Sequence, residues 1–162
     1  MIGLFVALGV SGCATPAPDP TPTPTGFATE AEAFAAAEAT YRAYIDASNA
    51  VDTTDPSTFA AVFGATGGEL NASARESLTE MHAEGTVVMG DSTYSNPVLV
   101  GWNPPIATIA VCLDVSRVSV SNSDGQSLVS PDRPPIQSIA VDVDLDIQKV
   151  IEIRPSGMAG RC

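Results

Sequence analysis

The spacing of apolar residues changes along this chain of 162 residues, and that change constrains the fold more than any other feature. Between Thr29 and Gly85 apolar residues recur every three or four positions, as in helices packed on one side. From Thr86 onward they alternate with polar residues, as in strands with one buried face. Helices followed by antiparallel strands are typical of α+β domains. We therefore predict N-terminal helices packed on a curved antiparallel sheet.

Three helices are expected in the first half. The first begins after Thr29, which forms a capping-box pattern with Glu32, and ends near Asn49. Its expected core face comprises Phe34, Ala37, Tyr41, Tyr44, Ile45 and Ser48. A short second helix starts at Asp55-Pro56 and stops at Gly64, with inward residues Phe59, Val62 and Phe63. The third begins near Asn71, with a rival capping box at 73–76, and ends at Gly85, presenting Leu78 and Met81.

Strands are expected over residues 86–94, 97–102, 106–120, 136–147 and 149–154. In the third of these, one face carries Ile109, Val111, Leu113 and Val115, and the other carries Thr108, Ala110, Cys112 and Asp114. Asp124-Gly125 predicts a hairpin turn. Whether Leu145-Asp146 lies in a turn or within a strand is left open.

The N-terminal residues indicate export. Residues 2–10 form an apolar run that is too short to span a bilayer as a helix but suits a secretory signal. The segment Val10-Ser11-Gly12-Cys13 resembles the lipobox of bacterial lipoprotein precursors. That resemblance implies removal of a signal peptide, residues 1–12, and acylation (diacylglycerol, palmitate) of the Cys13 thiol. The alternative is a buried N-terminal strand or helix. Because residues 1–4 contain no Lys or Arg, we expect the true translation start to lie upstream.

The segment after Cys13 predicts a stalk. Residues 14–26, ATPAPDPTPTPTG, favour extended polyproline II, which at about 3.1 Å per residue gives a spacer of roughly 40 Å. We therefore divide the chain into a signal peptide (1–12), a lipidated Cys with a Pro/Thr-rich stalk (13–26) and one α+β domain (27–162). The expected location is the outer face of the bacterial cytoplasmic membrane, lipid-anchored and extracellular. The stalk threonines are either free or O-glycosylated.

The chain has 3 cysteines, and lipidation of Cys13 would leave two. An even number in an oxidising compartment predicts a disulfide between Cys112 and Cys162. The alternative is a pair of buried free thiols.

Charge limits the partners. The formal net charge is −12, from 19 acidic and 7 basic residues. Such a chain repels phosphate backbones and anionic headgroups, so nucleic acid is excluded as an expected partner and membrane contact is expected through the lipid alone.

Two resemblances extend these expectations. The order of elements resembles the cone-shaped fold of the nuclear transport factor 2-like (cystatin-like) superfamily. The chain also resembles uncharacterised lipoproteins of actinobacteria, through segments 40–59, 68–85 and 110–116 and a Cys at its end. In cone-fold enzymes a His or Asp inside the cavity serves as general acid or base and Tyr holds an oxyanion. That resemblance implies the candidates His82, Tyr41, Tyr44 and Asp114.

For each of these four residues, a structural role is an alternative to a catalytic one. Tyr41 and Tyr44 lie at core spacing, Asp114 can cap a strand, and a single helical His is usually a boundary residue. Asp142, Asp144 and Asp146 would lie some 7 Å apart on one strand face, and we favour a solvated face or a protected sheet edge over a cation site. Trp102 is either an exposed contact or part of the core. We expect no catalytic residue, no metal site and no cofactor.

Three functions remain open. The favoured one is a non-catalytic binding or accessory domain that holds a small apolar ligand or an envelope protein. The second is an enzyme of isomerase or cyclase type, which needs polar groups converging in the cavity. The third is a purely structural envelope protein with a filled cavity.

Overall fold

The computed structural model describes residues 26–157 and Cys162. The predictions about the signal peptide, Cys13 and the stalk fall outside these residues. The helices are α1 (Glu30–Asn49), the 3-10 helix η1 (Pro56–Phe59), α2 (Ala60–Ala65) and α3 (Gly68–Glu84). The strands are β1 (Val87–Met89), β2 (Thr93–Asn103), β3 (Ile106–Asp114), β4 (Ser119–Ser121), β5 (Ile136–Asp144) and β6 (Lys149–Pro155).

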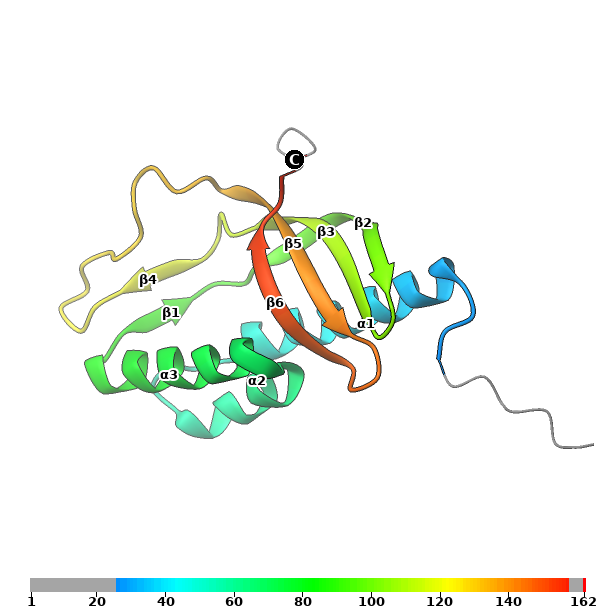
Figure 1. The fold of residues 1–162 in the computed structure, drawn as a ribbon. Coiled ribbons are helices and arrows are strands. Elements are labelled where there is room, and N and C mark those ends of the chain that lie inside the picture. Colours follow the sequence, from blue (N-terminus) through cyan, green and yellow to red (C-terminus); the bar gives the residue numbers. More distant parts are fainter. Residues whose placement is uncertain (1–25, 158–161) are drawn as a thin grey trace, which may run out of the picture.

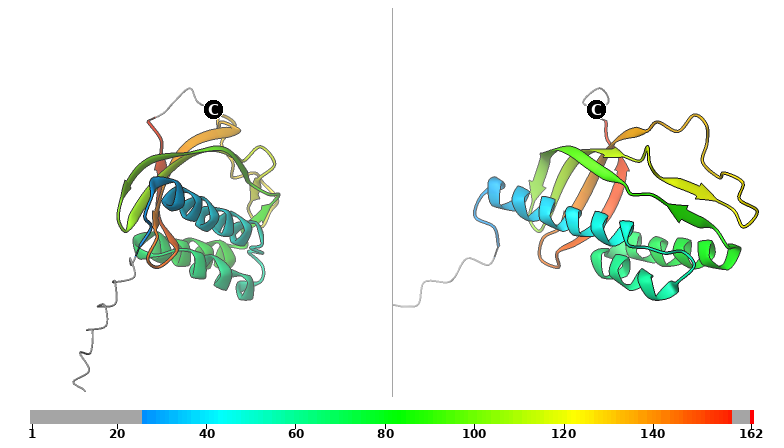
Figure 2. Two further views of the ribbon diagram at one scale, coloured as in Figure 1. Left: turned by 90° about the vertical axis from the view of Figure 1, so that its right-hand side faces the viewer. Right: turned by 180° about the vertical axis from the view of Figure 1, so that it is seen from behind.

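The fold is α+β, as predicted. Strands β2, β3, β5 and β6 form an antiparallel sheet in that order, and β1 pairs with β4 in a separate two-stranded ribbon. The main sheet curves around α1, while the ribbon extends away from it alongside α3 (Figures 1 and 2). The sheet stays open and does not close into a barrel (Figure 1).

Helix α1 packs on the sheet through one stripe of side chains. The predicted capping box is present, because the Thr29 hydroxyl accepts from the Glu32 backbone N–H and the Glu32 carboxylate accepts from the Thr29 N–H. The buried residues of the helix recur every four positions: Ala33, Ala37, Tyr41 and Ile45. They meet the buried sheet residues Ile109, Val111, Val141 and Val143 in one core cluster. The sequence predicted both this helix and most of this face.

The second and third helices differ from expectation at their boundary. Helix α2 continues through Gly64 to Ala65 and ends where Thr66 turns to extended backbone and bridges to Val150. Helix α3 then begins at Gly68, three residues before the predicted start. The reason is that the Asn71 amide does not cap its own helix but donates to the Phe63 carbonyl at the end of α2, 2.7 Å away.

The strands also break at other places than predicted. Residues 86–94 do not form one strand, because Gly90 separates β1 from β2. Gly90 has φ +84°, and its backbone lies so close to the Arg117 carbonyl that no Cβ fits there. Strand β2 instead runs through Ser95-Asn96-Pro97 by means of a bulge.

The expected strand 106–120 also divides. Strand β3 ends at Asp114, whose carboxylate accepts from the Ser116 N–H in a turn. The Arg133 guanidinium donates to the carbonyls of Val115 and Val118 and holds this turn in place. The chain then enters β4, and the predicted turn at Asp124-Gly125 follows.

The Asp142–Asp146 row is not a continuous strand face. Strand β5 ends at Asp144, so Asp146 lies in the turn that leads to β6. Asp142 accepts from Thr108 (2.7 Å) and from both terminal nitrogens of Arg154 (2.8 and 3.2 Å). The idea of a protected edge is wrong, because β5 is an inner strand of the sheet.

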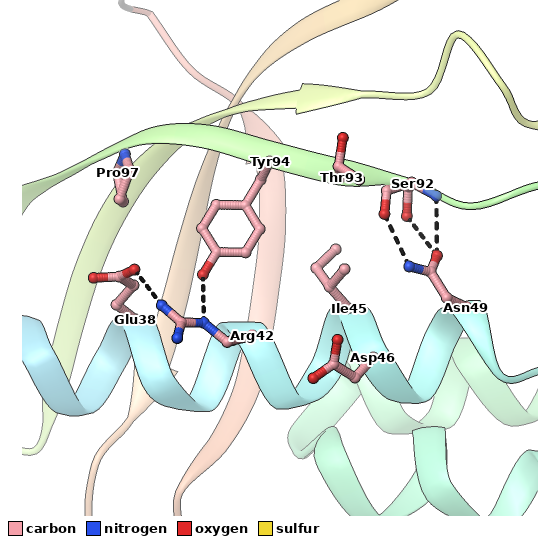
Figure 3. Close-up of a pocket in the computed structure, with 9 residues that line it drawn as sticks. All are labelled: Glu38, Arg42, Ile45, Asp46, Asn49, Ser92, Thr93, Tyr94 and Pro97. Atoms are coloured by element: carbon pink, nitrogen blue, oxygen red, sulfur yellow. Dashed lines mark hydrogen bonds and ion pairs between the residues drawn. The ribbon is translucent and has the colours of Figure 1, made fainter.

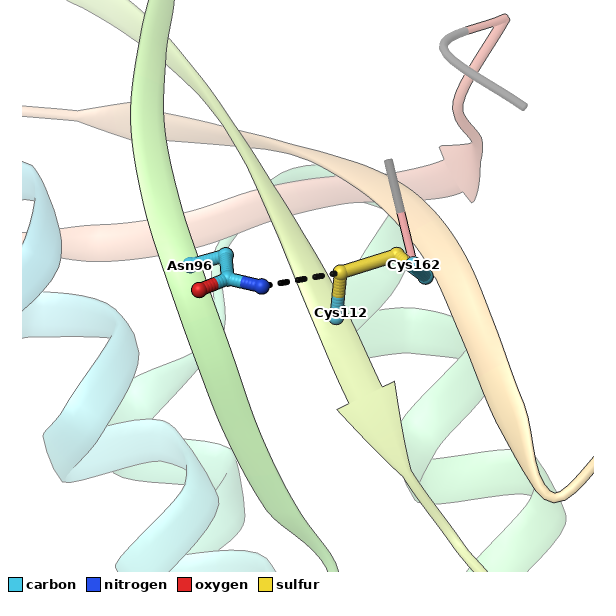
Figure 4. The surroundings of a disulfide bond; sticks show 3 residues. All are labelled: Asn96, Cys112 and Cys162. Atoms are coloured by element: carbon cyan, nitrogen blue, oxygen red, sulfur yellow. Dashed lines mark hydrogen bonds between the residues drawn. A yellow bond between two sulfur atoms is a disulfide. The ribbon is translucent and has the colours of Figure 1, made fainter. Parts of the chain in front are cut away.

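The predicted disulfide is present. Cys112 on β3 is bonded to Cys162, with 5.5 Å between the Cα atoms and a sequence separation of 50. Figure 4 shows the bond on β3, with the Asn96 amide beside the Cys112 sulfur. The last residue is thereby fastened to an inner strand of the sheet.

Candidate functional site

The candidate site is a cavity with two adjoining lobes. The inner lobe has a volume of about 310 Å³ and lies between α1 and the strands of the main sheet. The outer lobe has a volume of about 340 Å³ and lies between α1, α3 and β1. The two lobes share Tyr44, Ser48, Asn49, Val88 and Gly90 in their walls.

The inner lobe is walled mainly by apolar side chains. Strands β3, β5 and β6 and the turn after β3 contribute Leu113, Val115, Val118, Ile139 and Ile153. Tyr41 closes the lobe from the side of α1. Its ring lies against Tyr94 (centroids 5.0 Å apart, edge-on) and Tyr44 (6.0 Å, stacked).

The outer lobe lies along the inward face of α3. None of the residues of α3 is buried, although Leu78 and Met81 point inward as predicted. These two side chains wall the lobe rather than fill it, together with Ala74 and with Val62 of α2. The lobe is therefore open and mainly apolar, as in sites that bind small molecules.

Tyr41 contributes to the wall of the inner lobe and Thr53 to that of the outer lobe. The hydroxyls of both residues are buried and have no hydrogen-bond partner among the described residues. A buried polar group without a partner costs about 1–3 kcal/mol of stability. Burial raises the pKa of the Tyr41 phenol far above its usual range, and the nearby Tyr44 and Tyr94 raise it further. Burial also raises the pKa of Tyr44. Both phenols are therefore neutral hydrogen-bond donors at physiological pH.

Asn49 and Ser92 form the wall of the inner lobe on the side of β2. The Asn49 amide donates to the Ser92 carbonyl (2.9 Å) and its oxygen accepts from the Ser92 N–H and hydroxyl (3.0 Å each). Figure 3 shows this pair at one end of an open, polar hollow on the outer side of the wall. At the other end of that hollow, Arg42 binds Glu38 and the Tyr94 hydroxyl.

The structure brings together only two of the four candidate residues. Tyr41 and Tyr44 line the cavity, whereas His82 and Asp114 do not. His82 is exposed, with its Nδ1 atom 2.9 Å from the Thr53 carbonyl oxygen and its ring edge-on to Phe59. Asp114 caps the turn after β3, and the hydrogen bonds from Ser116 hold the pKa of its carboxyl below the usual range.

Sequence reasoning did not find Asn49, Thr53, Val88 or Gly90 in this site. The first two lie at the end of α1 and in the loop after it, and no spacing pattern marks them. Gly90 was a usable signal, because a glycine inside an alternating apolar segment indicates a bend or a close approach of two backbones. Trp102 is half-buried and packs against the core cluster.

The described residues hold neither a cluster of metal ligands nor a membrane-spanning helix. Within residues 26–157 and Cys162, His, Cys, Asp and Glu side chains nowhere gather in a group of three or more that could hold a metal ion. The helices in this part of the chain are too short or too polar to cross a bilayer.

Comparisons with known proteins give little. No protein-family model matches the chain, and no curated protein matches it. Among solved structures, a de novo designed β-sheet protein studied by NMR is similar, with a TM-score of 0.36 and 10% identity over 82% of this chain and 97% of that chain. This likeness is too weak to indicate function. The resemblances to actinobacterial lipoproteins and to the cone-shaped superfamily stay predictions.

Proposed function

We propose that this domain binds a small, mainly apolar molecule in the two-lobed cavity and does so without catalysing a reaction. The observation that carries the proposal is the open outer lobe beneath α3, whose inward side chains wall a space instead of filling it. A purely structural protein would gain stability by closing this space, because tight packing favours the folded state.

An isomerase or cyclase is less well supported. Such chemistry needs a general acid or base within hydrogen-bond reach of the substrate. His82 and Asp114 lie outside both lobes, and the one carboxylate among the described wall residues is the exposed Asp91. Tyr41 and Tyr44 have raised pKa values and therefore supply no base at physiological pH.

We further propose that the domain is held by a lipid on Cys13 to the outer face of a bacterial cytoplasmic membrane. The support is the lipobox pattern at 10–13 and the Pro/Thr-rich stalk behind it. The disulfide between Cys112 and Cys162 agrees with this location, because disulfides persist in oxidising compartments. We expect a Cys13→Ala variant to leave the membrane fraction. A variant that stays there would contradict the anchor.

Native mass spectrometry of the exported protein tests the binding function. We expect a reproducible added mass that is lost on denaturation. As a matched test, Ala74→Trp places a large side chain in the outer lobe and should abolish that mass. Ala72→Trp, on the exposed side of the same helix, should retain it. An apo mass from the native protein, combined with no uptake of added apolar compounds, would contradict the proposal.

A further inference from the structure

We infer that the ligand of the outer lobe is an amine, an apolar body that carries one ammonium group at its end. This inference rests on the proposed binding function and names the ligand class for the outer lobe alone. It depends on one exposed carboxylate at the lobe, that of Asp91, and on the absence of positive charge among the described residues that line the lobe.

The apolar body of the ligand would contact the wall of the lobe. That wall is formed mainly by Leu78 and Met81 of α3, Val62 of α2 and Val88 of β1. The volume of about 340 Å³ lies within the range of small-molecule sites, about 300–1,000 Å³. These side chains favour apolar area of any kind, so the charge of the ligand is decided by the polar part of the wall.

Asp91 is held at the lobe by both of its neighbours in the chain. Gly90, directly before it, lies so close to the Arg117 carbonyl that no Cβ fits between them. Ser92, directly after it, forms three hydrogen bonds with the Asn49 amide. Because the backbone is fixed on both sides, the Asp91 side chain stays beside the lobe.

The Asp91 carboxylate has no partner within the part of the chain that the structure describes. The ion pairs in that part involve Arg42 and Arg154, and neither of them reaches Asp91. Asp91 is exposed, so an ammonium group that pairs with it would keep part of its hydration. The cost of removing the two charges from water is therefore small, in contrast to a buried ion pair.

An anionic ligand would find no such partner. Among the described residues that line the outer lobe there is no Lys, Arg or His to pair with a carboxylate or a phosphate. Asp91 would repel either group at short range. The net charge of the chain, −12, adds repulsion at longer range and attracts cations to the domain. A neutral ligand would gain nothing from Asp91.

The test uses the full chain, exported with Cys13→Ser so that no acyl chains compete. Isothermal titration calorimetry at pH 7 and about 20 mM NaCl compares octylamine, which is protonated at this pH, with 1-octanol and octanoate. We expect octylamine to bind about two- to fivefold more tightly than 1-octanol, as for an exposed ion pair, and octanoate to bind more weakly than both. The preference for the amine should shrink at about 0.5 M NaCl, because salt screens exposed charges.

A matched pair of variants tests the role of Asp91. Asp91→Asn keeps the size of the side chain and removes its charge, so octylamine should fall to the affinity of 1-octanol, which itself should not change. Asp132→Asn removes the same charge from an exposed loop residue that lines neither lobe, and it should keep the preference. Both variants should unfold at the temperature of the native chain, because no side-chain partner is lost at either position.

A second pair separates binding in the lobe from general attraction of cations to an acidic surface. Ala74→Trp places its side chain in the outer lobe and should abolish the binding of octylamine. Ala72→Trp, on the exposed side of α3, should retain it.

The outcomes distinguish the ligand class from the binding function. Three results would each overturn the amine: octylamine that binds no more tightly than 1-octanol, a preference that survives in Asp91→Asn, or octylamine binding that persists in Ala74→Trp. In each case, binding of 1-octanol that Ala74→Trp abolishes would still support the proposed function. Failure of all three probes to bind would overturn the binding function itself.

Discussion

Asn49 and Ser92 are joined by three hydrogen bonds through a single side-chain amide, although 43 residues separate them in the chain. Asn49 ends α1 and Ser92 directly precedes β2, so the pair fixes the helix against the start of the sheet. It also separates the polar outer hollow from the apolar lobes, because Asn49 contributes to the walls of all three.

Removal of this amide should weaken the domain. We expect Asn49→Ala to lower the free energy of unfolding by about 1–3 kcal/mol, because it leaves the half-buried Ser92 N–H and carbonyl without their partner. Urea denaturation measures the change. Ser92→Ala loses only the hydroxyl contact and should have a smaller effect. Equal losses in the two variants would argue against this role for the amide.

Gly90 should be far more sensitive to substitution than another glycine with a similar backbone. Gly90 and Gly125 have φ of +84° and +77°, but only at Gly90 would a Cβ collide with a carbonyl, that of Arg117. We expect Gly125→Ala to lower stability by about 1 kcal/mol and Gly90→Ala to lower it by clearly more. The Gly90 variant should also lose affinity for the ligand, since this residue lines both lobes.

Thermal unfolding of both alanine variants, followed by circular dichroism, checks the difference. Similar melting temperatures would show that the close approach to Arg117 is relaxed at little cost.

The disulfide should supply a large share of the stability. It closes a loop between positions 50 residues apart, for which chain entropy predicts about 4 kcal/mol. We expect the double variant Cys112→Ala/Cys162→Ala to unfold at much lower urea concentration than the native protein. Reductant should shift the native protein in the same direction and leave the double variant unchanged. A native midpoint that does not respond to full reduction would contradict this prediction.

Alkaline pH should destabilise the protein through Tyr41. Burial raises the folded-state pKa of this phenol above its unfolded value near 10, so its contribution is complete below about pH 10 and is lost as pH rises further. We expect the free energy of unfolding to fall by about 1 kcal/mol per pH unit above pH 10 from this group. Tyr41→Phe should flatten that decline.

Urea midpoints at pH 9, 10 and 11 measure the effect, with Tyr94→Phe as the control because the Tyr94 hydroxyl binds the exposed Arg42. If Tyr41→Phe and Tyr94→Phe decline equally with pH, the buried phenol is not the cause.

Local signals in the sequence predicted most of the fold. The capping box at Thr29, the glycine cap at Gly85 and the alternation in β3, β5 and β6 are each set by residues close in the chain. The errors occurred where distant residues decide, as with Asn71, which binds a preceding helix, and Gly90, which meets Arg117.

The same distinction applies to the site. Tyr41 and Tyr44 could be predicted as candidate site residues because they lie on the packed face of α1. His82 lies outside the lobes because it contacts the Thr53 carbonyl and the Phe59 ring. Thr53 reaches the outer lobe from a loop with no repeating pattern. Spacing along a chain predicts which face is inward, but it does not predict whether the space behind that face is filled.

The irregular edge strand β2 affects whether copies of this protein can pair through their sheets. Its pairing with β3 is interrupted twice, and Pro97 lies within the first interruption, where it offers no N–H. Exposed sheet edges otherwise recruit further strands and initiate fibrils. Under the proposed lipid anchor, copies would meet at high local concentration, and an edge of this kind disfavours their pairing side by side.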